Sequence, residues 1–246
     1  MRSRSLTASA LLSSCVLLAA CGSDGQGALG GVLASDEPPA AAPAELLLSD
    51  VTVAGHTFGA ETVPLEDVKE MLDATTDQNV AVDPPECDAD MTVGIERLDP
   101  ATSAIKTSMS QSSTVVLTVS EDTSNAGFKN EDLDACGEVT VTSELFGMGT
   151  MTITTRTSEI QADAPGNVDD FRALKYEMSG DGPTVEGISM ADLMPGGTTV
   201  LLTGVERERM ILVTAESPDG SRDEAALTDA AEEIFAAQVE KVRDAE

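Results

Sequence analysis

The chain has 246 residues, of which 44 are Asp or Glu and 14 are Lys or Arg, so its formal net charge is −30 at pH 7. This charge excludes nucleic-acid binding, because contacts with phosphate require a positively charged surface. We interpret the acidity as a solvated surface that resists aggregation, with calcium binding or a basic partner as the alternatives. Aromatic residues make up only 2% of the chain, so its core must be built from aliphatic side chains.

Residues 1–20 have the layout of a lipoprotein signal peptide. Two arginines precede an apolar stretch that is shorter and richer in serine than the roughly 20 apolar residues of a membrane-spanning helix. The sequence Leu-Ala-Ala-Cys at residues 18–21 resembles the bacterial lipobox, which implies attachment of a lipid to the Cys21 sulfur and cleavage before Cys21. We therefore expect a lipid anchor on the extracytoplasmic face of the cell membrane. The alternative is an ordinary secretory signal in which Cys21 is incidental.

Residues 21–44 are predicted to form a flexible tether that joins the anchor to a folded domain at residues 45–246. The tether consists mainly of Gly, Ala, Ser, Pro and acidic residues. Such a composition offers too little apolar surface to offset the entropy lost on folding. We expect the domain to stand off the membrane.

The remaining cysteines predict one disulfide bond. Cys15 lies in the signal peptide and Cys21 is assigned to the lipid, which leaves Cys87 and Cys136. An exported protein enters an oxidising compartment, so these two thiols are expected to pair. The bond would close a loop of about 50 residues and stabilise the fold by about 4 kcal/mol. The alternative, a metal or redox thiol site, lacks neighbouring ligands.

The apolar periodicity predicts the following elements in chain order. Residues 64–74 are expected to form a helix with Pro64 at its first position. A short helix is expected to end near Gly137. About six strands are expected, with a hairpin turn at residues 147–149 and a second reversal around residues 205–208. The strands fall within residues 113–120, 138–145, 148–162, 171–180 and, as a pair, 198–217.

The last predicted element is a longer C-terminal helix. Ser221 and Glu224 have the spacing of a capping box at its start. Its apolar face contains Leu227, Ala231, Ile234, Phe235, Gln238 and Val242. These elements together predict a single α+β domain, in which an antiparallel sheet carries a short N-terminal helix and the longer C-terminal helix on one face.

The sequence lacks the residues that catalytic and metal sites usually need. His56 is the single histidine, so a zinc cluster and a Ser-His-Asp arrangement are not expected. We predict that His56 is an exposed or locally bonded turn residue. A calcium loop starting at Asp122 has Ala126 and Leu133 at two positions that require oxygen ligands. We therefore expect no catalytic residue, no metal and no cofactor.

Three further segments carry a resemblance to a known family. They are LLLSDVTVAGHTFG at residues 46–59, VDPPEC at 82–87 and LDACGEVTV at 133–141. With the C-terminal helix, they resemble actinobacterial cell-envelope lipoproteins related to the extracellular PknH-type sensor domain. The residues that match are Leu46, Leu47, Pro84, Pro85, Cys87 and Cys136. The resemblance extends over residues 45–246 and implies a compact α+β sensor-like fold with a central cleft.

We expect a lipid-anchored envelope lipoprotein that is a non-catalytic binding or sensor-like module rather than an enzyme. Its ligand would be a small molecule, a lipid or an envelope protein. One alternative is a carrier of lipid or a small apolar ligand. The other is an envelope hydrolase that uses paired carboxylates such as Asp169 and Asp170.

Overall fold

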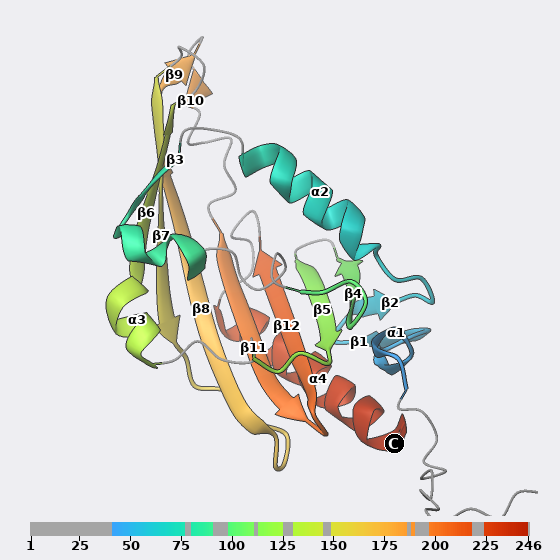
Figure 1. The fold of residues 1–246 in the computed structure, drawn as a ribbon. Coiled ribbons are helices and arrows are strands. Elements are labelled where there is room, and N and C mark those ends of the chain that lie inside the picture. The colour runs from blue at the N-terminus through green and yellow to red at the C-terminus, as the bar shows by residue number, and fades with distance from the viewer. Residues whose placement is uncertain are drawn as a thin grey trace, which may run out of the picture. The chain divides into compact units, whose positions relative to one another are not determined.

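The described residues form an antiparallel sheet of eight strands, in the spatial order β3-β6-β7-β8-β11-β12-β5-β4 (Figure 1). The strands are β3 (Val80–Asp83), β4 (Ser103–Met109), β5 (Thr114–Ser120), β6 (Glu138–Glu144), β7 (Thr150–Glu159), β8 (Asp169–Asp181), β11 (Thr198–Glu206) and β12 (Arg209–Ser217). Two short hairpins form separate sheets: β1 (Val51–Val53) with β2 (His56–Phe58), and β9 (Thr184–Val185) with β10 (Ile188–Ser189). The helices are α1 (Pro43–Leu46), α2 (Leu65–Thr76), the 3-10 helix η1 (Pro85–Asp90), α3 (Asn130–Cys136) and α4 (Glu224–Ala245).

This computed structural model describes residues 41–76, 80–90, 98–110, 113–124, 130–144, 149–185, 188–189, 197–217 and 224–245. The predicted signal peptide, Cys21 and most of the predicted tether lie outside these residues, as does Ser221 of the predicted capping box. Among the helices in these ranges, none is long and apolar enough to cross a membrane.

The predicted α+β fold with about six strands is wrong, because the described residues are mostly β structure with one long helix at the C-terminal end. The predicted strands are present, and β6 pairs antiparallel with β7, as β11 does with β12. Residues 147 and 148 of the predicted hairpin turn lie outside the described residues. The strands at both edges of the sheet, β3 and β4, were not predicted from the sequence. β3 has only four residues and is followed by two prolines. β4 contains buried serines and a buried lysine, so it lacks the alternation of apolar and polar residues that predicts a strand.

The main core lies between α4 and one face of the sheet. The predicted apolar face of α4 is confirmed, because Leu227, Ala231, Ile234, Phe235, Gln238 and Val242 are all buried. Strands β5, β11 and β12 contribute every second residue to this core, as expected when one face of a pleated strand is covered. These residues are Val115, Leu117, Val119, Val200, Leu202, Ile211, Val213 and Ala215. Leu46, Leu47 and Leu48 complete the same cluster, so the start of the domain is part of its core.

The opposite face of the sheet carries smaller apolar clusters. Leu65 of α2 packs with Ile105 and Met210 in one of them. Leu133 of α3 packs beside a second cluster formed by Leu174, Tyr176, Leu201 and Leu212. The predicted disulfide is confirmed: it joins Cys87 of η1 to Cys136 at the end of α3, with the two Cα atoms 5.6 Å apart. The bond therefore ties the segment after edge strand β3 to the residues that lead into β6.

Candidate functional site

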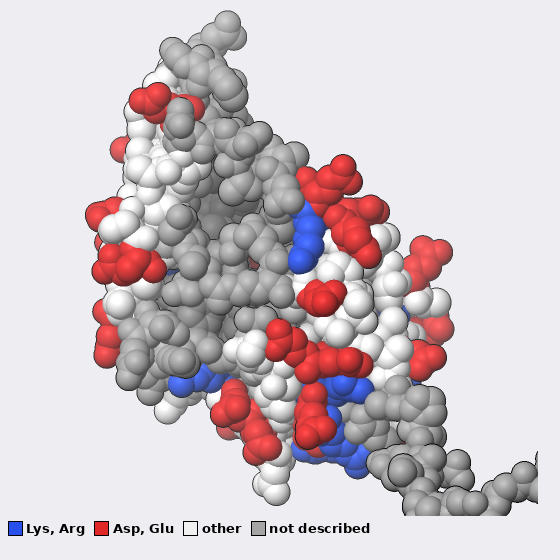
Figure 2. Space-filling model, in the orientation of Figure 1, with Lys and Arg blue, Asp and Glu red and all other residues white. Residues whose placement is uncertain are grey.

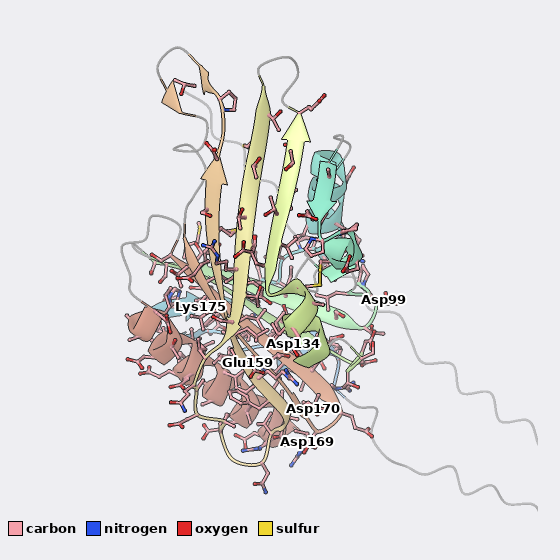
Figure 3. The ribbon with its side chains drawn as sticks, turned by 90° about the vertical axis from the view of Figure 1, so that its left-hand side faces the viewer. Asp99, Asp134, Glu159, Asp169, Asp170 and Lys175 are labelled. Carbon is pink, nitrogen blue, oxygen red and sulfur yellow. A yellow bond between two sulfur atoms is a disulfide. The ribbon has the colours of Figure 1, made fainter. Side chains whose placement is uncertain are left out.

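An open groove of about 660 Å³ lies at the connection between β7 and β8. This volume is in the range of about 300–1,000 Å³ that is typical of small-molecule sites. The end of β7, the connection itself, the start of β8 and one residue of α4 form the lining. The lining residues are Glu159, Ile160, Gln161, Ala162, Asp163, Phe171, Arg172, Ala173 and Glu232. Figure 3 labels Glu159 at the end of β7 and Asp169 and Asp170 at the start of β8, so the connection can be followed between them.

Two side chains of α4 bond the backbone of the connection and hold it in place. The backbone N–H of Asp163 donates a hydrogen bond to Glu232 Oε1 at 2.7 Å. The Arg243 guanidinium donates to the Pro165 carbonyl oxygen at 3.4 Å. Gly166 has a φ of +72°, and a Cβ atom there would lie 3.3 Å from Arg243 Nη1. Glycine therefore fits both the left-handed backbone and the close approach of the guanidinium.

Four apolar lining residues, which we call the floor of the groove, are continuous with the main core. Ile160, Ala162 and Phe171 are partly buried against the core, and Ala173 belongs to it. The Ile160 N–H donates to the Ala173 carbonyl oxygen at 3.0 Å, so sheet pairing continues one residue past β7. The Phe171 ring meets the Phe235 ring of α4 edge to face, with centroids 5.4 Å apart. These contacts fix the floor without any ligand.

The rim of the groove is charged. Glu159, Asp163 and Glu232 supply three carboxylates against the one guanidinium of Arg172, so the lining has a formal charge of −2. Arg172 Nη1 and Glu159 Oε1 form an ion pair at 3.1 Å. Elsewhere, Figure 2 shows carboxylates scattered over the visible face, as the net charge of −30 leads one to expect. The combination of an apolar floor with a negative rim suits the binding of a ligand that has both apolar and cationic parts.

The prediction that His56 is an exposed or locally bonded turn residue is wrong. Its side chain is 0% exposed, and its Nε2 atom lies 3.1 Å from Ser113 Oγ, which is 57 residues away in the chain. The turn itself consists of Ala54 and Gly55, both with positive φ. His56 instead begins β2, in which His56 and Phe58 are buried and the residue between them is exposed. The hairpin therefore directs the imidazole into the protein.

Lys106 is a second buried ionisable residue, and its burial was not predicted from the sequence. It is 1% exposed, and its ammonium donates to the carbonyl oxygens of Leu48 at 3.0 Å and Gly59 at 2.6 Å. A third hydrogen bond goes to Ser49 Oγ. Burial lowers the pKa of Lys106, and the nearby carboxylate of Asp50 opposes this effect. These contacts attach residues 48–59 to β4, which is a structural role.

The other residues singled out in the sequence lie away from the groove or outside the described ranges. Cys21 is among the residues that the structure does not describe. Cys87 and Cys136 form the disulfide and do not line the groove. Asp169 and Asp170 are exposed at the start of β8 and are also absent from the lining. Within the described ranges, no group of three or more His, Cys, Asp or Glu side chains has the arrangement of a metal site.

None of the groove residues was identified from the sequence. Asp163 and Glu232 are 69 residues apart, and their hydrogen bond depends on how α4 packs against the sheet. One local signal was available: the segment that connects β7 to β8 contains Ile160, Ala162 and Val168, and such apolar residues are unusual in a solvent-exposed connection. They indicate that the segment packs on the core.

Comparison with known proteins gives little further information. No protein-family model and no curated protein matches this chain. One solved structure, an uncharacterized protein from Mycobacterium smegmatis, is similar with a TM-score of 0.39 and 16% sequence identity. The match covers 67% of this chain and 77% of the Mycobacterium smegmatis chain.

Proposed function

We propose that this chain is a lipid-anchored lipoprotein of the cell envelope and acts there as a non-catalytic binding module. The lipobox-like sequence at residues 18–21 is the observation that carries the anchor. Two or three acyl chains on Cys21 would hold the protein at the extracytoplasmic face of the membrane. The Cys87–Cys136 disulfide supports an exported location, because disulfides persist in oxidising compartments.

The groove between β7 and β8 supports the binding role. Its floor is fixed by contacts to the core, and ligand sites are usually largely formed before the ligand binds. The resemblance of residues 45–246 to the PknH-type sensor domain supports a sensor-like use of such a site. Any signal would then pass to a partner protein in the envelope.

Substitution of Cys21 tests the anchor, and Cys15 provides a matched control. The full chain is expressed in an actinobacterial host with an alkyne analogue of palmitate, and cell fractions are examined for the label. We expect that wild-type protein and the Cys15→Ala variant become labelled and sediment with membranes. The Cys21→Ala variant should carry no label and should leave the membrane fraction. An acylated, membrane-bound Cys21→Ala protein would contradict the proposal.

Native mass spectrometry tests the binding role. The wild-type protein is isolated from membranes, and its mass is compared with that of the acylated chain. A stoichiometric mass increase from a co-purifying molecule is the expected result, and fragmentation gives the chemical class of that molecule. Turnover of glycan or ester substrates, abolished by one Asp or Glu substitution, would instead establish the carboxylate hydrolase.

A further inference from the structure

Two carboxylates at the groove have no cationic partner among the described residues. Arg172 pairs with Glu159 and so compensates one of the three negative charges of the rim. Glu232 accepts a hydrogen bond from the Asp163 backbone, but neither Glu232 nor Asp163 takes part in an ion pair with a described residue. The uncompensated negative charge therefore lies on the side of the groove formed by α4 and the connection.

The apolar floor adds a second requirement for the ligand. Phe171 is one of the lining residues, and its ring is held against Phe235. A hydrated metal ion or a small polar cation would gain little from covering Ile160 and Phe171, because the gain on burial is proportional to apolar area. A cation that has an apolar body can cover this floor while its charged end faces the carboxylates. The face of a phenylalanine ring also attracts cations.

We propose that the groove between β7 and β8 binds a small organic cation, in which a protonated amine is joined to an apolar body. The amine lies near Glu232 and Asp163, and the apolar body lies on Ile160 and Phe171. This inference rests on the proposed binding role and assigns a ligand class to it. It does not rest on the lipid anchor.

Phenethylammonium chloride is a suitable probe, because it has one ammonium group and one phenyl ring. We titrate it into the full chain carrying Cys21→Ser, which removes the predicted lipid and changes no described residue. Amide shifts in ¹H–¹⁵N NMR spectra report the site. The expected changes saturate and centre on residues 159–163 and 171–173. The neutral analogue 2-phenylethanol and the short cation ethylammonium each lack one of the two features and should bind more weakly.

Glu232 and Glu233 provide a matched pair of variants on α4. Glu232 lines the groove, whereas Glu233 is exposed and is not part of the lining. Glu232→Gln keeps an oxygen that can accept the Asp163 N–H, so the connection keeps its hydrogen bond. We expect Glu232→Gln to weaken binding about two- to fivefold, the range for a partly exposed ion pair. Glu233→Gln removes the same charge from the protein and should leave the affinity unchanged.

Four results would overturn this inference. One is the absence of saturable binding. The second is a set of amide shifts that spread over the acidic surface. The third is an equal loss of affinity in Glu232→Gln and Glu233→Gln. Either of these two results would mean that only the net charge of the protein attracts the cation. A ligand of different chemistry on the membrane-derived protein would also overturn the organic-cation assignment, but it would leave the proposed binding role intact. Failure of acylation at Cys21 would affect the anchor alone.

Discussion

Gln238 offers a direct test of how the start of the domain is held in the core. This α4 residue is 0% exposed. Its Oε1 atom accepts a hydrogen bond from the Leu48 N–H at 3.0 Å, and its Nε2 atom donates to the Leu46 carbonyl oxygen at 2.7 Å. One carboxamide therefore satisfies two buried backbone groups of a segment that is not paired in the main sheet. The perturbation we consider is Gln238→Met.

The expected loss of stability follows from those two hydrogen bonds. Methionine has nearly the volume of glutamine, so the substitution should create little cavity. It leaves the Leu46 C=O and the Leu48 N–H buried without their partner, and each such group costs about 1–3 kcal/mol. We expect the free energy of unfolding to fall by about 3 kcal/mol. For a domain of this size, about 1 kcal/mol corresponds to a shift of about 2–4 °C in Tm, so the melting temperature should fall by about 6–12 °C.

Urea denaturation with the disulfide intact measures this change, and hydrogen exchange localises it. The Leu48 amide should be protected in the wild type and should exchange faster in Gln238→Met. Glu240→Met is the control, because Glu240 is an exposed residue of the same helix and the substitution should change stability by less than about 0.5 kcal/mol. A Gln238→Met protein as stable as the control, with Leu48 still protected, would refute the reasoning.

Three more predictions concern the rest of the fold. Gly204→Ala should lower the urea midpoint and destabilise by about 1–3 kcal/mol, since a Cβ atom there would lie 2.5 Å from Val168 Cγ1; an unchanged midpoint would contradict this. Reduction of the disulfide, which spans 49 residues and ends at Cys136, should cost about 4 kcal/mol in the same assay, and a negligible cost would count against the chain-entropy estimate. The pKa of Lys106 lies below 10.5 in the folded state, so the unfolded chain binds more protons between the two values. The unfolding free energy of the wild type should therefore rise relative to Lys106→Met as the pH approaches 10.5, and parallel pH profiles would show that the lysine is not desolvated.

Elements that bury one face were predictable, because the pattern lies within the element. The α4 helix shows a 3.6-residue period, and β12 alternates between the main core and the opposite face. β4 could not be predicted in this way. Lys106 in its middle is buried because its ammonium donates hydrogen bonds to carbonyl oxygens 47 and 58 residues earlier in the chain. A local pattern contains no information about such distant acceptors, so the polar residues of β4 did not predict a buried strand.

The groove residues could not be predicted for the same reason, because their partners are distant in the sequence. Glu232 lies on the helix whose apolar face was predicted, but nothing in the helix indicates that this particular carboxylate meets the Asp163 backbone. The prediction for His56 was wrong for a related reason. Its glycine-flanked sequence correctly indicated a turn, whereas its burial depends on Ser113 near the start of β5. Turn type is a local property, and burial is decided by what packs on the turn.

The α4 helix contacts the start of the domain through a buried residue, Gln238, and the groove through a partly exposed residue, Glu232. Gln238 is fully buried and bonds backbone groups of the core, so its substitution should act on stability. Glu232 is partly exposed and bonds the backbone of a surface connection, so its substitution by glutamine should act on binding. The two side chains share no hydrogen-bond partner. Effects at sites without shared partners usually add, so the Gln238→Met, Glu232→Gln double variant should show both losses in full. Non-additive losses would mean that the groove and the start of the domain are coupled through α4.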